Sequence, residues 1–242
     1  MWYVATYQQV ALFSLRQSLS TSSGGKTLLV PTPFALKMAL LDVAIRTLGK
    51  EQAALLFPYI RDLRIAVLLP EQLVVINSFL KIVRPKKHGP SDDVGSGLVT
   101  PFGSTIASRE FVFYSEPFGL ALSEKEGHEL PQELVQLLTQ INYIGKRGSF
   151  IQLLELPQRR EQLDEQWTVL TTNQQTFLAH GTIQLLDDCG PVLSFERADV
   201  TSGVRLVVGK DRVQNSIVLP CQQMRYSRGF TLFQRINTEE MQ

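Results

Sequence analysis

Two short segments place basic side chains beside glycine, which lets a ligand approach the backbone closely. The first is Gly24-Gly25-Lys26-Thr27, and the second is Gly145-Lys146-Arg147-Gly148 followed by Ser149. Arginine can grip a phosphate through two parallel N–H groups, and lysine acts on it as a compact point charge. Both segments therefore have the chemistry to hold the phosphates of a nucleotide or a nucleic acid.

The first segment invites comparison with a P-loop. That motif needs a glycine at position 20, where this chain has Ser20, so a nucleotide-hydrolysing P-loop is disfavoured. The alternatives are a surface turn, or a loop that leads to the anion-tolerant start of a helix. The helix is predicted over residues 33–48, with Thr32 as N-cap, Pro33 in the first position and Gly49 just after the end.

The start of this predicted helix offers unpaired backbone N–H groups and partial positive charge. Lys37 lies one turn inside it and interrupts an otherwise apolar pattern. The whole stretch from Gly24 to Ile45 therefore has features that suit a phosphate.

The second segment has two interpretations. It could be a phosphate-binding turn, or a glycine cap that ends a helix predicted over residues 131–141, with cations that complement the helix dipole. The sequence leaves both open.

Catalytic groupings are weak. His88, His128 and His180 are isolated from one another in the sequence. Metal-independent RNA cleavage needs a general base and a cation near the scissile phosphate, which Tyr143, Lys146 and His88 could supply. This set is a minor alternative, and no catalytic residue is predicted.

Metal and cofactor signals are absent from the sequence. Cys189 and Cys221 form no CxxC motif, and the pairs Asp92-Asp93 and Asp187-Asp188 are typical of turns. We expect no cofactor and no metal site.

The elements that must position these residues follow a strand-helix-strand-strand-helix-strand order. This order predicts an α+β, ferredoxin-like (RRM-like) domain followed by a C-terminal antiparallel β region. The predicted strands of the first part cover residues 2–15, 64–69, 72–83, 109–122 and 151–154, and a short helix over 51–60 is interrupted at Pro58. Short strands are predicted over residues 168–170, 182–186, 192–195, 204–208, 217–219 and 230–233.

Residues 85–108 are the most loop-like part of the chain. They contain four glycines, three prolines and few large apolar groups, so little can be buried there. Loops of this length are usually functional or disordered.

Charge is unevenly distributed although the net charge is only +1. Residues 1–110 carry twelve Lys and Arg against seven Asp and Glu, residues 111–202 carry six against thirteen, and residues 203–242 carry six against three. Basic ends and an acidic middle permit one face for nucleic acid and another for protein partners. No apolar run is long enough for a membrane helix and no secretory signal is visible, so a cytoplasmic protein without a membrane partner is expected.

The stretch from Pro31 to Ile45 and the turn Tyr143-Ile144-Gly145-Lys146-Arg147-Gly148-Ser149 together resemble the Cas-five family. This family belongs to the RAMP superfamily and supplies an RNA-binding subunit of type I CRISPR Cascade complexes. The resemblance extends to members that serve CRISPR-associated Tn7-like transposons. The start Pro31-Thr32-Pro33 departs from the Pro-Pro-Thr-Thr pattern of many members.

The resemblance implies an architecture. An RRM-like RNA-binding domain would cover residues 1–155, with a thumb or hairpin inserted at 85–108, and a smaller β-rich region would cover 156–242. It implies a subunit that caps the 5′ handle of the crRNA and contacts the large and backbone subunits. The complex would meet target DNA near its PAM-proximal end.

The residues expected to bind RNA are those of the two glycine-containing segments and their surroundings. They are Arg16, Lys26, Thr27, Lys37, Tyr143, Gly145, Lys146, Arg147, Gly148 and Ser149. Tyr7 or Phe150 is available for base stacking. Some family members cleave precursor crRNA, but a non-catalytic role is expected here. The alternatives are a metal-independent endoribonuclease and a backbone subunit that polymerises along the guide.

Overall fold

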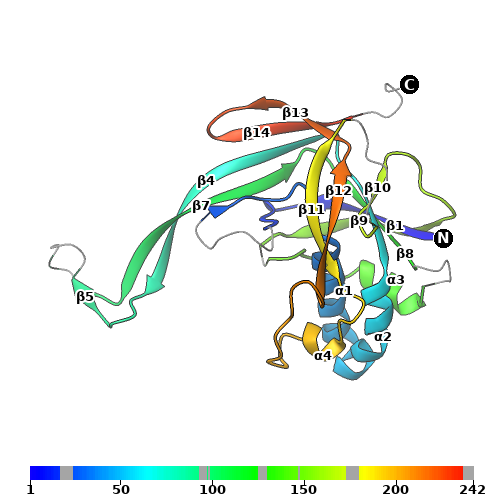
Figure 1. The fold of residues 1–242 in the computed structure, drawn as a ribbon, viewed down its shortest axis with the longest axis horizontal. Helices are drawn as coiled ribbons and strands as arrows, with labels where there is room; N and C mark the ends of the chain where they lie inside the picture. The colour runs from blue at the N-terminus through cyan, green and yellow to red at the C-terminus, as the bar shows by residue number, and fades with distance from the viewer. Residues whose placement is uncertain are drawn as a thin grey trace.

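The computed structural model describes residues 1–16, 24–92, 97, 99–124, 130–146, 148–172 and 180–236. Two five-stranded sheets and three main helices form the body, and one long β-hairpin projects from it (Figure 1). No helix in these described ranges is long and apolar enough to cross a membrane.

The first sheet is antiparallel throughout and contains strands from both halves of the chain. Its order is β10 (Trp167–Val169), β3 (Arg64–Leu68), β8 (Phe118–Ser123), β1 (Trp2–Gln9) and β9 (Ile151–Arg160). Helices α1 (Pro33–Leu48) and α2 (Lys50–Asp62) connect β1 to β3, and α3 (Gln132–Leu138) lies between β8 and β9. The mixed content agrees with the predicted α+β class.

The second sheet joins the C-terminal strands to the hairpin. Its order is β13 (Cys221–Tyr226), β14 (Phe230–Arg235), β4 (Gln72–Pro85), β7 (Phe102–Tyr114) and β2 (Gly24–Gly25). Strands β4 and β7 pair without interruption from Leu73 and Tyr114 to Pro85 and Phe102, and their outer halves form the hairpin (Figure 1). The short strands β5 (Ser91–Asp92) and β6 (Val99–Thr100) lie at its tip.

A separate two-stranded ribbon lies against α1. It consists of β11 (Thr182–Cys189) and β12 (Arg212–Leu219), and the short helix α4 (Phe195–Ala198) lies in the connection between them. The same buried hydrophobic cluster includes Leu40 of α1, Leu120 of β8 and Leu186 of β11, so one core extends through these layers.

Helix α1 has the predicted boundaries because its signals are local. The Thr32 hydroxyl oxygen accepts a hydrogen bond from the Ala35 N–H at 3.1 Å, and Gly49 adopts φ 85° at the other end. Helix α2 differs from its prediction, since it continues through Pro58 to Asp62.

Other predicted elements also differ from the structure. The first strand ends at Gln9 rather than at residue 15. The strands predicted over 192–195 and 204–208 are absent, and α4 begins at Phe195 instead. Part of the predicted loop 85–108 is strand, because residues 102–108 pair with residues 79–85 and satisfy their backbone groups without burying many side chains.

Candidate nucleic-acid interface

A cavity of about 390 Å³ lies where the two glycine-containing segments meet the start of α1. Five basic side chains line it, and the described lining includes no Asp or Glu. The basic residues are Arg16, Lys26, Arg109, Lys146 and Arg212, and the other lining residues are Ser14, Leu15, Gly25, Leu28, Thr32, Phe34, Ala35, Met38 and Gly145. The predicted residues Arg16, Lys26, Gly145 and Lys146 are therefore brought together although they are far apart in the sequence.

Gly25 makes room for one of these cations. It pairs with Arg109 where β2 runs parallel to β7, and a Cβ atom built on Gly25 would lie 2.9 Å from Arg109 Nη1. The Arg109 side chain thus occupies the space that a residue larger than glycine would fill. The next residue on β7, Glu110, accepts a hydrogen bond from the Thr27 N–H at 2.9 Å and fixes the loop that carries Lys26.

The second segment forms a tight turn held by its own backbone. The Ile144 N–H donates to the Ser149 carbonyl and the Ser149 N–H donates to the Lys146 carbonyl, both at 3.1 Å. Gly145 at φ 72° and Gly148 at φ 102° occupy the conformations that favour glycine. Lys146 is exposed at the turn, whereas Arg147 lies outside the described residues.

This turn is not a helix cap. Helix α3 ends at Leu138, and the N–H of its C-cap Thr139 bonds back to the helix, so Gly145 lies well beyond the helix end. The helix-cap alternative left open by the sequence is therefore wrong.

Two of the residues predicted to bind RNA, Ser149 and Thr27, are buried and use their hydroxyl groups to hold the cavity wall together. Ser149 is buried, and its Oγ accepts a hydrogen bond from the Ser14 N–H at 3.3 Å. Thr27 is buried as well, and its Oγ1 accepts from the Leu15 N–H at 3.1 Å. Both hydroxyls tie the segment before residue 17 to the cavity wall.

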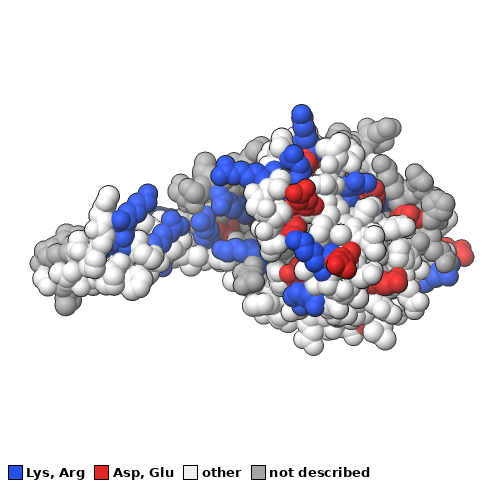
Figure 2. All heavy atoms as spheres, turned by 90° about the horizontal axis from the view of Figure 1, so that it is seen from below, with Lys and Arg blue, Asp and Glu red and all other residues white. Residues whose placement is uncertain are grey.

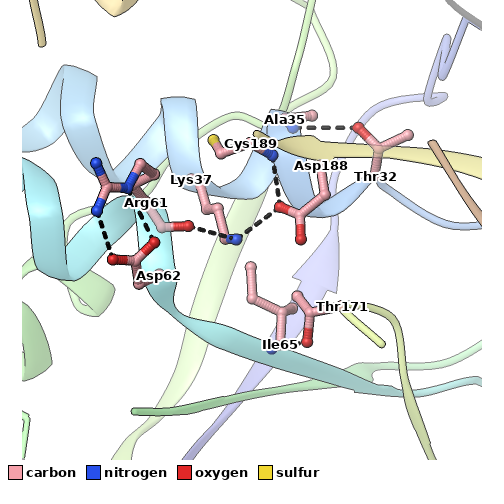
Figure 3. A network of polar contacts seen from close by, with 9 residues as sticks. All are labelled: Thr32, Ala35, Lys37, Arg61, Asp62, Ile65, Thr171, Asp188 and Cys189. Atoms are coloured by element: carbon pink, nitrogen blue, oxygen red, sulfur yellow. Dashed lines mark hydrogen bonds and ion pairs between the residues drawn. The ribbon is translucent and has the colours of Figure 1, made fainter. Parts of the chain in front are cut away.

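Lys37 does not reach this surface. Its side chain is 2% exposed, and Nζ lies 2.6 Å from Asp188 Oδ1 and donates to the Arg61 carbonyl at 2.8 Å (Figure 3). Burial raises the pKa of the Asp188 carboxyl, and the nearby Lys37 ammonium opposes that rise. The prediction of a phosphate contact by Lys37 is thus wrong, since this lysine joins α1 to β11 and the end of α2.

Arg212 reaches the cavity from β12 and was not predicted. Its Nη2 donates to Asp187 Oδ2 at 2.6 Å, and its guanidinium carbon lies 4.4 Å from the centre of the Phe34 ring. Asp187 is 2% exposed and also accepts from Gln214 Nε2 at 3.2 Å. No neighbouring residue in the sequence marks Arg109 or Arg212 as a site residue. The pairing of β7 with β2 places Arg109 at the cavity, and the ion pair with Asp187 places Arg212 there.

The predicted aromatic residues lie in different environments. Tyr7 is fully buried and its hydroxyl donates to the Leu138 carbonyl at 2.6 Å, so it cannot stack on a base. Phe150 is 47% exposed and pairs with the half-buried Tyr143 beside the turn. Tyr143 lines a second, more apolar cavity of about 520 Å³ between α1 and residues 198–206.

Comparison with known proteins gives one curated relative. No protein-family model matches the chain. The CRISPR-associated protein Cas5 of Archaeoglobus fulgidus is 26% identical over 151 residues, which cover 62% of this chain and 61% of that protein. The resemblance to the Cas5 family is confirmed. The chain thus spans about three fifths of the length of the curated Cas5 relative.

Two solved structures align with most of this chain. A CRISPR protein from Archaeoglobus fulgidus aligns over 98% of this chain and 92% of its own, with a TM-score of 0.42 and 13% identity. A chain of a CRISPR RNA-guided surveillance complex aligns over 99% of this chain and 92% of its own, with a TM-score of 0.49 and 13% identity.

The projecting hairpin of this chain adds a second basic surface. Lys81, Arg84, Lys86 and Lys87 lie on it, and the acidic residues in the sequence of residues 77–108 are Asp92, in β5 near its tip, and Asp93. Figure 2 shows Lys and Arg side chains along the hairpin and at its junction with the body, whereas acidic side chains lie mainly on the body. Basic side chains that could contact phosphates therefore lie both on the hairpin and around the cavity of the body.

The candidate nuclease residues are not gathered in one site. His88 lies in the turn beyond β4 on the hairpin, whereas Lys146 and Tyr143 line cavities of the body. His128 lies outside the described residues. Within the described ranges, no three His, Cys, Asp or Glu side chains are grouped so that they could hold a metal ion.

Proposed function

We propose that this chain is a non-catalytic subunit of a type I CRISPR Cascade complex and that it binds and caps the 5′ handle of the crRNA. The observation that carries the proposal is the cavity with five basic side chains and no acidic ones, next to a basic hairpin. Cations arranged around an open pocket complement the phosphates of a single strand. The choice of crRNA as the bound strand follows from the resemblance to Cas5.

The strand order supports a ferredoxin-like assignment for the first sheet. Strands β3, β8, β1 and β9 are adjacent in that order, with helices after β1 and after β8, as a split strand-helix-strand arrangement requires. In this proposal the thumb is the outer part of the β4–β7 hairpin, which includes the expected segment 85–108. The β-rich region after residue 155 supplies Arg212 to the same cavity.

The partners follow from the resemblance. We propose contacts with the large and backbone subunits of Cascade, and through the assembled complex with target DNA near the PAM-proximal end. A role in RNA-guided transposition belongs to the same proposal. The gene neighbourhood tests it, because a large subunit, a backbone subunit and a separate processing nuclease would be encoded nearby.

The first prediction concerns the turn. Replacing Lys146 and Arg147 with Ala should weaken crRNA retention by the assembled complex and lower the salt slope of binding by about two units, one for each lost phosphate contact. The measurement is the amount of copurified crRNA, together with binding at several salt concentrations. A matched control replaces the exposed pair Arg159 and Arg160 of β9 with Ala.

Unchanged crRNA copurification in the Lys146 and Arg147 variant would contradict the proposal. Discrete cleavage of precursor RNA by the purified chain in EDTA would replace it with the endoribonuclease alternative. Several copies of the chain per complex in native mass spectrometry would instead favour a polymerising backbone subunit.

A further inference from the structure

The basic cavity has one wall that is held rigidly in place. The Arg212 guanidinium is anchored at one edge by Asp187, at 2.6 Å, and rests on the Phe34 ring at 4.4 Å. About a quarter of the Arg212 side chain remains exposed and lines the cavity. A guanidinium held in this way offers a flat surface whose orientation is fixed before any ligand binds.

Asp187 holds Arg212 without reaching the cavity itself. The Asp187 side chain is 2% exposed and is not part of the lining, and Gln214 Nε2 donates to its second oxygen at 3.2 Å. Its negative charge is thereby directed at Arg212 rather than at the cavity. Asp187 is a positioning residue.

The remaining lining divides into two kinds of surface. Arg16, Lys26 and Arg109 gather near the small residue Gly25, whereas Leu28, Ala35 and Met38 are apolar. The volume of about 390 Å³ falls within the ~300–1,000 Å³ typical of sites that enclose a small molecule. A ligand that fits both surfaces carries an anionic group and a flat, largely apolar body.

A bare phosphate would leave the apolar wall exposed, and an apolar side chain of a protein would place uncharged atoms among five cations. A nucleotide fits both the basic and the apolar surface of the cavity, because its phosphate is anionic and its base is flat. Bases that are turned out of a single strand commonly stack on arginine guanidinium planes in RNA-binding proteins.

We propose that this cavity takes one nucleotide turned out of the bound RNA strand, with its base against the Arg212 guanidinium and its phosphate near Lys26 and Arg109. The inference rests on the proposed RNA-binding function and adds a single-nucleotide subsite to it. Because Arg212 comes from β12, the C-terminal region is part of the RNA site.

The test is a scan of the RNA with one abasic nucleotide at each handle position in turn. Complexes are assembled from the full chain, its partner subunits and an equal mixture of an intact and an abasic synthetic crRNA, and the two bound RNAs are then counted. One position should discriminate by about 2- to 30-fold, the equivalent of the ~0.5–2 kcal/mol that a guanidinium gains over an aromatic face.

The variant Arg212→Gln should lose this discrimination at the one sensitive position and leave the other positions unchanged. The double variant Asp187→Asn with Arg212→Gln should behave in the same way, and it removes both members of the buried ion pair, so it keeps the test valid if Arg212→Gln alone folds poorly. The single variant Asp187→Asn should weaken the discrimination without changing binding of the RNA that is abasic at that position. A purely structural role of Asp187 would lower binding of every RNA equally.

Two results would overturn the inference while the proposed function stands. In one, the complex retains crRNA but no single handle position discriminates. In the other, a sensitive position exists but Arg212→Gln does not alter it. Failure of the wild-type complex to retain any crRNA through this chain would contradict the proposed function itself, and the inference with it.

Discussion

Lys37 illustrates how a buried partner changes the role of a basic residue. From the sequence its charge beside a helix start favoured a phosphate contact, but the structure pairs it with Asp188 on a distant strand. Both side chains are nearly inaccessible, at 2% and 9% exposed. Removing only one charge would leave the other buried and unpaired, which typically costs ~3–5 kcal/mol.

The variant Lys37→Met should therefore be destabilised by about 3–5 kcal/mol at neutral pH. Burial already raises the pKa of Asp188, and loss of the lysine should raise that pKa further. A raised carboxyl pKa means that the folded state holds its proton to higher pH, so stability falls as pH rises above the ordinary carboxyl value of about 4. Urea unfolding at pH 5 and pH 8 should show the smaller loss at pH 5.

The control for this prediction is the double variant Lys37→Met with Asp188→Leu, which removes both charges and should recover most of the stability. Each variant that folds should keep its crRNA, since Lys37 does not line the basic cavity. Normal stability with lost crRNA in Lys37→Met would show that the buried pair is not its main role.

Among single residues, those next to glycine were predictable and those on strands were not. Lys26 and Lys146 stand beside glycines that mark them in the sequence, and both line the cavity. Arg109 and Arg212 carry no such mark, because the register of β7 with β2 and the pair with Asp187 place them. Long-range pairing of this kind cannot be read from local composition.

At the scale of elements, the same distinction separates α1 from the hairpin. The cap at Thr32 and the stop at Gly49 lie within the helix's own sequence, so both ends of α1 were predicted correctly. The hairpin is stabilised by cross-strand backbone pairing between β4 and β7, and most of its outer side chains remain exposed. A sequence with little to bury thus resembled a loop although it forms strands.

The hairpin should therefore be removable. Replacing residues 80–107 with Asn-Gly would join the paired residues Phe79 and Ser108 through a two-residue turn that suits antiparallel strands. The free energy of unfolding should change by less than about 1 kcal/mol, because most of the deleted residues lie outside the core. The salt slope of RNA binding should fall by up to about four units, since four basic residues are deleted.

A matched control keeps the hairpin and replaces only its four basic residues, Lys81, Arg84, Lys86 and Lys87, with Gln. If the slope falls equally in both variants, charge explains the effect. A large loss of stability in the shortened chain would show instead that the hairpin supports the body.

At the scale of the whole molecule, the division expected at residue 155 falls within a strand. Strand β9 runs from Ile151 to Arg160 along the edge of the first sheet. Strand β10 belongs to that sheet as well, and β14 pairs with β4 in the second sheet. Strands β10, β13 and β14 are thus built into the two five-stranded sheets, whereas β11 and β12 form a two-stranded sheet of their own against α1.

This arrangement predicts that residues 1–155 and 156–242 unfold together. A fragment ending at residue 155 would expose the side of β4 that β14 covers, where Leu73 is fully buried, and would leave Lys37 without Asp188. The loss of one buried charge partner and of three strands, β10, β13 and β14, from the five-stranded sheets is large compared with a typical stability of ~5–15 kcal/mol. Calorimetry of the full chain should give one transition with equal calorimetric and van't Hoff enthalpies, and the fragment should lack near-ultraviolet circular dichroism. Two separate transitions, or a fragment with native tertiary signals, would show that the basic cavity is assembled between independently folded units, since Arg212 would then reach it from a separate domain.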